Sequence, residues 1–177
     1  LDTVDLPAFG PIDGMVLCAG QHLFRPFALS KEQHFLQQFS ANVLTATNTI
    51  HAFLKLLSKK TSSIVLLSSA VIKSSGVGTA AYSVSKAALC GLAKGLAHEL
   101  AARNIRINTI LPGIVKTPMT DKLFSKLSQE QIGALTAKHL LGLGSTTEIA
   151  NVISFLLSDQ SKWMTGAEVV VDGGFLS

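Results

Sequence analysis

A tyrosine and a lysine stand four residues apart near the middle of this 177-residue chain. Tyr82 is its only tyrosine, and Lys86 follows at the i+4 spacing that places two side chains on one face of a helix. An ordinary phenol has a pKa of about 10, so it acts as an acid or base near neutrality only where a cation stabilises the phenolate. Lys86 could supply that charge. Ser69, thirteen residues before Tyr82, is expected to hold a substrate oxygen in the same cleft.

The elements that carry these side chains follow from the hydrophobic pattern. The short apolar run at residues 14–19 is typical of a strand buried on both faces of a parallel sheet, and residues 64–67, 106–111 and 168–172 are predicted to form three further strands. Apolar residues at helical spacing predict three helices: about 31–58, with a bend, 81–102 and 147–157. Parallel neighbours need crossover connections, so this alternation predicts an α/β domain with an open, mostly parallel sheet and helices on both faces.

Three further segments complete the predicted domain, which spans residues 1–177. Residues 1–13 contain two prolines and no sustained period, which indicates a loop before the first strand. Ser30, with Gln33 three residues later, is the expected N-cap of the first helix. The more polar region 116–146 is expected to form one or two short helices and to act as a substrate-binding flap.

Composition excludes several other classes of protein. The 15 Lys and Arg outnumber the 11 Asp and Glu, but they are scattered rather than gathered in a stripe, so we expect no nucleic-acid partner. The cysteines, Cys18 and Cys90, stand in no spacing that binds a metal, so we expect no metal site and a reducing compartment. No apolar run is long enough to cross a bilayer, so we expect no membrane partner and a cytoplasmic location.

The residues after each predicted strand resemble those of the short-chain dehydrogenase/reductases, in particular the 3-oxoacyl-carrier-protein-reductase-like branch. The resemblance covers nearly the whole chain. It rests on six features: CAG at Cys18–Gly20, Asn42, Ser69, YSVSK at Tyr82–Lys86, NTILPGIVKTP at Asn108–Pro118 and GAEVVVDGG at Gly166–Gly174. It implies a Rossmann-like, doubly wound fold that acts as an NAD(P)-dependent oxidoreductase on a small-molecule carbonyl or alcohol, with NADP slightly favoured over NAD.

The resemblance implies a role for each catalytic residue. Tyr82 would be the general acid in reduction and the base in oxidation. Lys86 would lower the pKa of Tyr82 and hydrogen-bond the nicotinamide ribose, while Ser69 would orient and polarise the carbonyl. Asn42 would hold a water that links Lys86 to solvent. The implied cofactor contacts lie in two segments and at two of the catalytic residues: Cys18, Ala19, Gly20, Tyr82, Lys86, Pro112, Gly113, Val115 and Thr117.

The sequence departs from the family in two places. Cys18 replaces an asparagine of the usual NNAG, and the glycine-rich TGxxxGxG that would bind the cofactor's pyrophosphate is absent. We expect the working protein to possess an N-terminal part beyond this sequence. The alternative is a catalytically inactive, truncated relative that acts as an oligomerisation or interaction module.

Simpler readings remain open for single residues. Asn42 could bond a neighbouring backbone, Thr117 could be an ordinary turn residue, and Ser68 rivals Ser69 by composition. The histidines are expected to be surface or core residues. The apolar faces of the helices at 31–58 and 81–102 are expected to pack in the core. Because the matching helices pair between subunits in the family, we also expect a homodimer or homotetramer.

Overall fold

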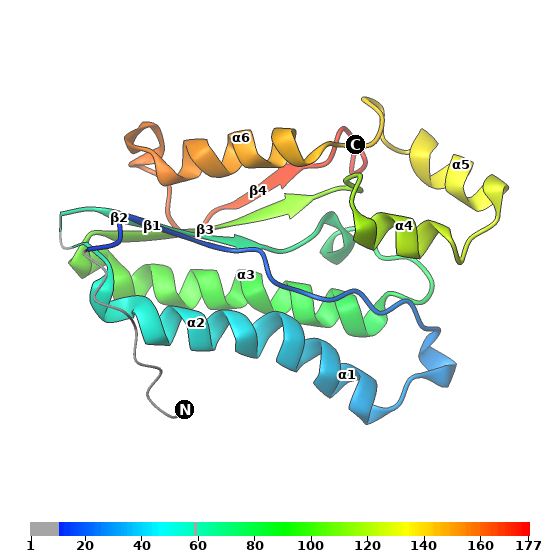
Figure 1. Ribbon diagram of the computed structural model, residues 1–177, viewed down its shortest axis with the longest axis horizontal. Helices are drawn as coiled ribbons and strands as arrows, with labels where there is room; N and C mark the ends of the chain where they lie inside the picture. The colour runs from blue at the N-terminus through cyan, green and yellow to red at the C-terminus, as the bar shows by residue number, and fades with distance from the viewer. Residues whose placement is uncertain (1–10, 59) are drawn as a thin grey trace.

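Four parallel strands form the sheet in the computed structural model, which describes residues 11–58 and 60–177. The strands lie side by side in chain order: β1 (Gly14–Leu17), β2 (Ser62–Leu67), β3 (Ile105–Pro112) and β4 (Glu168–Val171). Each neighbouring pair is parallel, so every connection crosses over a face of the sheet. Figure 1 shows the result, with helices on both sides of the strands. The predicted α/β class is confirmed, and residues 1–10 of the loop predicted at 1–13 lie outside the described residues.

The central strand β2 is apolar at successive positions from Ile64 to Leu67 because both of its faces are covered. In β2, Ile64 and Leu66 point to one face and Val65 to the other, and all three are fully buried. Ile64 and Leu66 pack in a cluster with Leu89, whereas Val65 packs in a second cluster with Leu156. The alternation of side chains along one strand thus fills two separate cores.

The first core lies between the sheet and two helices, α2 (Thr45–Phe53) and α3 (Ala80–Leu100), and α1 (Glu32–Phe39) packs against α3. The second lies beneath α6 (Thr146–Leu157) on the opposite face. The ends of α3 and α6 agree with the predicted 81–102 and 147–157 within about two residues, which is the ordinary scatter of helix ends.

The helix expected at 31–58 is interrupted, as the predicted bend required. A π-helical turn at Ser40–Leu44 separates α1 from α2, and a 3₁₀ turn at Leu54–Leu56 ends the run. The predicted N-cap was wrong. Lys31 is the N-cap, and its N–H donates to Nδ1 of His34 at 2.8 Å, whereas the Ser30 hydroxyl donates to the Pro26 carbonyl.

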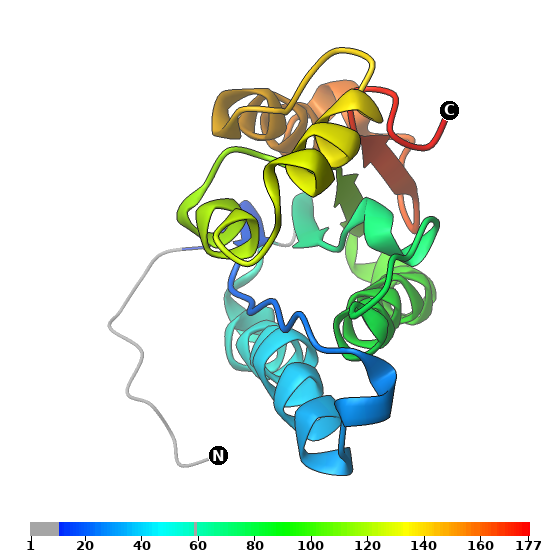
Figure 2. The same ribbon diagram turned by 90° about the vertical axis from the view of Figure 1, so that its right-hand side faces the viewer.

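The polar region after β3 folds into two short helices, as predicted. They are α4 (Pro118–Phe124) and α5 (Gln129–Ala137), and Figure 2 shows them at the carboxyl ends of the strands. Ser128 and Gln131 form a capping box that starts α5. No helix in the described residues is long and apolar enough to span a membrane.

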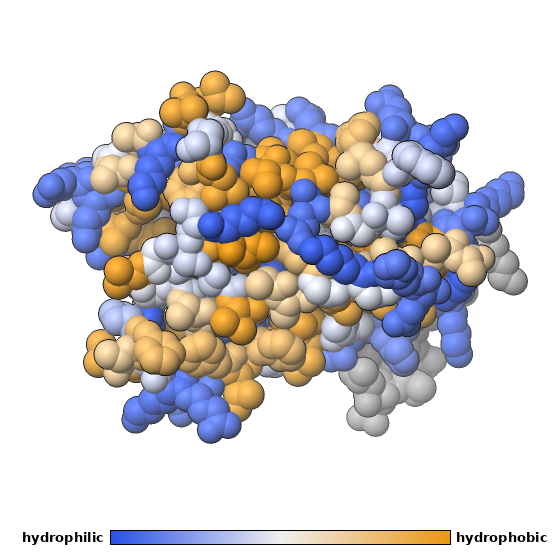
Figure 3. All heavy atoms as spheres, turned by 180° about the vertical axis from the view of Figure 1, so that it is seen from behind, coloured by the Kyte–Doolittle hydropathy of each residue, from blue (hydrophilic) through white to orange (hydrophobic). Residues whose placement is uncertain are grey.

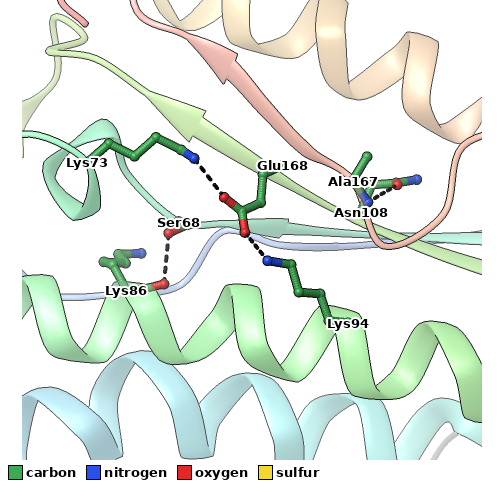
Figure 4. A network of polar contacts seen from close by, with 7 residues as sticks. All are labelled: Ser68, Lys73, Lys86, Lys94, Asn108, Ala167 and Glu168. Atoms are coloured by element: carbon green, nitrogen blue, oxygen red, sulfur yellow. Dashed lines mark hydrogen bonds and ion pairs between the residues drawn. The ribbon is translucent and has the colours of Figure 1, made fainter.

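An ionic network ties β4 to the helical layer of the first core. Glu168 accepts from Lys94 of α3 at 2.7 Å and from Lys73 at 3.0 Å (Figure 4). Asn108 of β3 holds the chain just before β4, because its Oδ1 accepts from the Ala167 N–H at 3.0 Å. These contacts fix the edge strand that follows the flap.

Candidate active site

Ligands of open α/β sheets bind beyond the carboxyl ends of the strands, and the predicted site residues lie there. Gly20 follows β1, Ser69 follows β2, and Gly113 follows β3. Tyr82 and Lys86 lie in the first two turns of α3, one turn apart. The fold therefore brings together segments that the chain separates widely, and Tyr82 lies near both Ser69 and Lys86.

Tyr82 is a nearly buried phenol, with 9% of its surface exposed. Burial raises its pKa to about 12, and the nearby Ser69 hydroxyl partly opposes this rise. The sequence had led us to expect that Lys86 lowers this pKa. In the structure desolvation outweighs any such effect, because the phenol would have to lose its proton and become a charged phenolate away from water.

Lys86 is a buried amine, with 5% of its surface exposed. Its Nζ donates to the carbonyl of Leu67, the last residue of β2, at 2.7 Å. The same nitrogen lies 5.8 Å from the centre of the Tyr82 ring. Burial lowers the pKa of Lys86 to about 8, so the amine remains mainly protonated at neutral pH.

Asn42 is fully buried and is held by three hydrogen bonds. Its Oδ1 accepts from the Gln21 N–H at 2.7 Å, and its Nδ2 donates to the Gln21 carbonyl at 3.0 Å and to the Ser85 hydroxyl at 2.8 Å. The structural reading of this side chain is therefore correct. A Cβ on Gly20 would lie 2.8 Å from Asn42 Oδ1 and 3.3 Å from Lys86 Nζ, so this close approach requires glycine.

The two serines after β2 have different tasks. The Ser68 hydroxyl is buried and donates to the backbone carbonyl of Lys86 at 2.8 Å (Figure 4). The Ser69 hydroxyl accepts from the Val71 N–H at 3.2 Å and also reaches the phenol of Tyr82. Ser69 is therefore the serine that faces the phenol, whereas Ser68 anchors the helix that carries it.

The loop after β3 is held by a histidine that the sequence did not single out. His139 is buried, and its Nε2 accepts from the Ile114 N–H at 3.0 Å. A Cβ on Gly113 would lie 2.9 Å from the backbone of Asp172 and 3.0 Å from His139 Nε2. The turn after Pro112 can thus form only with glycine at position 113.

The rest of this loop leads into α4. Val115 pairs with Gly144 in an isolated parallel bridge. Thr117 is the N-cap of α4, where its Oγ1 accepts from the Thr120 N–H, so the ordinary structural reading of Thr117 holds. Cys18 and Ala19 are exposed at the end of β1.

A cavity of about 400 Å³ lies between the segment that follows β1 and helix α4. Its lining combines apolar and basic side chains: His22, Phe24, Met119, Lys122, Leu123 and Lys126. His22 also packs edge-on against the ring of Tyr82, with 4.6 Å between ring centres. Sequence reasoning missed His22, whose only signal was its place two residues after Gly20. The described residues contain no cluster of three metal-ligating side chains.

Comparison with known proteins places this geometry in a family. A family model described as enoyl-(acyl carrier protein) reductase matches residues 6–176. The 3-oxoacyl-(acyl-carrier-protein) reductase of Staphylococcus aureus strain Mu50 is 35% identical over 167 residues, which cover 94% of this chain and 67% of that relative. The chain belongs to the short-chain dehydrogenase/reductase family. It is thereby assigned to the NAD(P)-dependent oxidoreductases, and it spans about two thirds of the length of this curated relative.

Solved structures agree with the assignment to the short-chain dehydrogenase/reductases. A blue fluorescent protein from a metagenomic library, in complex with NADPH, superposes with a TM-score of 0.84 at 30% identity, over 94% of this chain and 66% of that one. A 4-hydroxyisoleucine dehydrogenase complexed with NADH superposes with a TM-score of 0.80 at 28% identity, over 92% and 68% of the two chains. The predicted Rossmann-like fold is confirmed.

Proposed function

We propose that this chain carries a hydride-transfer site for a small-molecule carbonyl or alcohol, with Tyr82, Lys86, Ser69 and Asn42 as its catalytic set. The observation that carries the proposal is the convergence of three groups where β2 ends. The Ser69 hydroxyl reaches the phenol of Tyr82, and the Lys86 amine lies beside the same ring. An acid, a hydrogen-bond donor and a cation thus surround one point at which a substrate oxygen can bind.

Tyr82 is suited to act as an acid. When bound, the reduced nicotinamide supplies a hydride to the carbonyl carbon. Because its pKa is raised to about 12, the phenol is protonated at neutral pH and can donate its proton to the carbonyl oxygen, which takes the electron pair of the C=O bond. Ser69 can hydrogen-bond the same oxygen. In oxidation the proton moves the opposite way, from the alcohol to the phenolate.

Lys86 and Asn42 would return the proton that Tyr82 gives away. The Lys86 ammonium stabilises a phenolate more than a phenol, so it acts when the proton has left. Both N–H groups of the Asn42 amide are engaged, but its Oδ1 accepts one hydrogen bond, from the Gln21 N–H, and keeps a second lone pair. A water bound there would lie close to Lys86, because both side chains approach Gly20.

The residues present fit the nicotinamide end of a cofactor. Gly20 and Gly113 allow the protein's own groups to pack closely at the ends of β1 and β3, since a Cβ at either position would meet its neighbours within 3 Å. We propose contacts from Cys18, Ala19 and Gly20 on one side, from the catalytic Tyr82 and Lys86, and from the loop after β3: Pro112, Gly113, Val115 and Thr117. The sequence contains no TGxxxGxG, so we assign no residue to the pyrophosphate. We favour NADP slightly over NAD.

The substrate would be covered by the flap at 116–146. Met119 and Leu123 of α4 give the cavity an apolar wall, and Lys122 adds a basic one. The S. aureus relative is named a 3-oxoacyl-(acyl-carrier-protein) reductase, so 3-oxoacyl thioesters are the first substrates to test. An inactive interaction module is the weaker proposal, because each member of the catalytic set is present and Ser69 and Lys86 both lie near the phenol of Tyr82.

We also propose that the protein self-associates as a dimer or tetramer. Large apolar side chains are exposed on several elements: Phe27, Leu29, Leu36, Val77, Val84, Leu140, Leu141 and Trp163. Apolar surface is also visible on the face shown in Figure 3. Burying such side chains between subunits would remove them from water. Light scattering after size-exclusion chromatography tests this, and a monomeric mass would refute it.

The decisive experiment compares Tyr82→Phe with the unchanged protein. Nicotinamide fluorescence measures binding of NADH and NADPH, and the decrease of NAD(P)H absorbance with a 3-oxoacyl thioester measures turnover. We expect the variant to bind the cofactor with similar affinity and to lose turnover by at least about 100-fold, because only the proton donor is removed.

Ser69→Ala is a companion variant, and we expect its kcat to fall because the substrate oxygen loses a donor. Unchanged turnover in Tyr82→Phe would remove the phenol from the mechanism. Failure of the unchanged protein to bind either cofactor would refute the hydride-transfer proposal and favour the interaction module.

A further inference from the structure

His22 lies between the phenol and the cavity. It is half-buried, lines the cavity of about 400 Å³ and packs against the Tyr82 ring with an interplanar angle of 75°. Among the described residues, the lining of that cavity comes from positions 20–24 and 118–126 and does not include Tyr82. His22 is therefore the side chain through which the cavity meets the phenol.

The surroundings of His22 keep its ring neutral. Burial and the positive charge of Lys126 both lower its pKa, so at neutral pH the imidazole brings no charge to Tyr82. The charged groups around this pair come from elements other than the segment of His22: Lys86 of α3 lies near the phenol, and Lys126, which follows α4, lies near the imidazole. Neither ring nitrogen of His22 is hydrogen-bonded to another residue in the described part of the chain, so packing against Tyr82 is its main contact there.

We infer that His22 is a positioning residue, whose imidazole holds the orientation of the Tyr82 phenol and keeps cavity water away from it. An edge-on aromatic pair at this separation prefers a defined geometry, so the imidazole restricts how the phenol can lie. The inference rests on the proposed function, since it concerns the proton donor of that reaction. It means that a residue outside the catalytic set controls the orientation and the hydration of the phenol.

The single tyrosine makes the inference directly measurable. Near-ultraviolet absorbance of the phenolate reports Tyr82 alone, because the chain holds no other tyrosine. With a pKa of about 12, about a tenth of the phenol would be ionised at about pH 11. If His22→Ala admits water and the pKa falls by about one, half would be ionised, so the signal would rise about fivefold.

Three variants make the test specific. His22→Phe keeps an aromatic ring of similar size and is expected to titrate like the unchanged protein. Met119→Ala alters the wall of the same cavity from α4 and is also expected to leave the titration unchanged. His22→Asn replaces the alanine variant if that one loses its native circular dichroism. Circular dichroism at each pH confirms that the folded state is being titrated.

The titration needs neither cofactor nor substrate, so it separates this inference from the proposed function. A raised phenolate signal in His22→Ala, restored in His22→Phe, supports the positioning role even if no turnover is found. In an active protein, kcat is expected to fall in His22→Ala and to recover in His22→Phe, with little change in the KM for NAD(P)H. Identical titrations of His22→Ala and the unchanged protein would overturn the inference.

Discussion

Replacing Lys86 by methionine should stabilise the folded protein most at neutral pH and progressively less as the pH rises. The amine is 5% exposed, and burial lowers its pKa from 10.5 to about 8. The difference between these two pKa values means that the buried charge lowers the free energy of unfolding by about 3 kcal/mol. Methionine has a similar length and carries no charge.

The pH dependence has a definite sign. Below about pH 8 the amine is protonated in both states, so its full cost is present. Between about pH 8 and 10.5 the unfolded chain binds more protons than the folded one, so the stability of the unchanged protein rises with pH. Lys86→Met lacks this rise. Its advantage over the unchanged protein is therefore expected to shrink by about 2 kcal/mol between about pH 7 and pH 9.5.

Urea unfolding of both proteins at the two pH values measures this difference. Methionine also leaves the Leu67 carbonyl without its donor, which costs about 1–3 kcal/mol at either pH and cancels in the comparison. Lys162→Met, which removes a charge from an exposed position, corrects for the general effect of charge. Equal differences at both pH values would refute the view that burial destabilises the charged form of Lys86.

Two further perturbations test the support of the site. Gly113→Ala should lower stability by about 1–3 kcal/mol, because its Cβ would lie 2.9 Å from the Asp172 backbone. The control is Gly133→Ala in α5, where a Cβ meets nothing within 4 Å, and it should raise stability by up to about 1 kcal/mol. Thermal unfolding compares the two variants, and a Gly113→Ala protein at least as stable as Gly133→Ala would contradict the turn geometry. Glu168→Gln should cost about 1 kcal/mol in low salt and less in high salt, because its two lysine partners are largely exposed. Lys94 and then Lys73 lower the pKa of Glu168, so this contribution is present above about pH 4.5 and is lost as the pH falls below it; a loss that salt leaves unchanged in urea unfolding would point to packing instead.

Local patterns were sufficient to predict the elements of the fold. Residues 64–67 are apolar at successive positions, and this is the pattern of a strand covered on both faces, as β2 is. β3 is also largely buried, although Asn108 and Thr109 interrupt its apolar pattern. The N-cap at Lys31 was missed because its acceptor is a histidine ring nitrogen, which follows from the rotamer of His34 rather than from a common capping residue. Propensity likewise gives no signal for a π-helical turn, which depends on how Asn42 packs.

Contacts between distant segments limited what could be predicted of the site. The spacing of Tyr82 and Lys86 predicted that they share one face of a helix, and their positions one turn apart in α3 confirm this prediction. The direction of the Tyr82 pKa depends on how much water reaches the ring, and His22 and the end of β2 determine this from far away in the sequence. Sequence spacing shows that a charge lies near Tyr82 but not how much water surrounds the ring. We therefore expected a lowered Tyr82 pKa, whereas the structure raises it.

The structural and catalytic readings of Asn42 support each other. Its amide bonds both backbone groups of Gln21, which fixes the segment that holds Gly20 on one side and His22 on the other. Gly20 lies against Lys86 Nζ, and His22 lies against the Tyr82 ring. A side chain that orders this segment therefore affects the surroundings of the Lys86 amine and of the Tyr82 phenol at once. Removing the Asn42 amide would disturb both even if no water ever bound there, so loss of activity alone could not establish a proton relay.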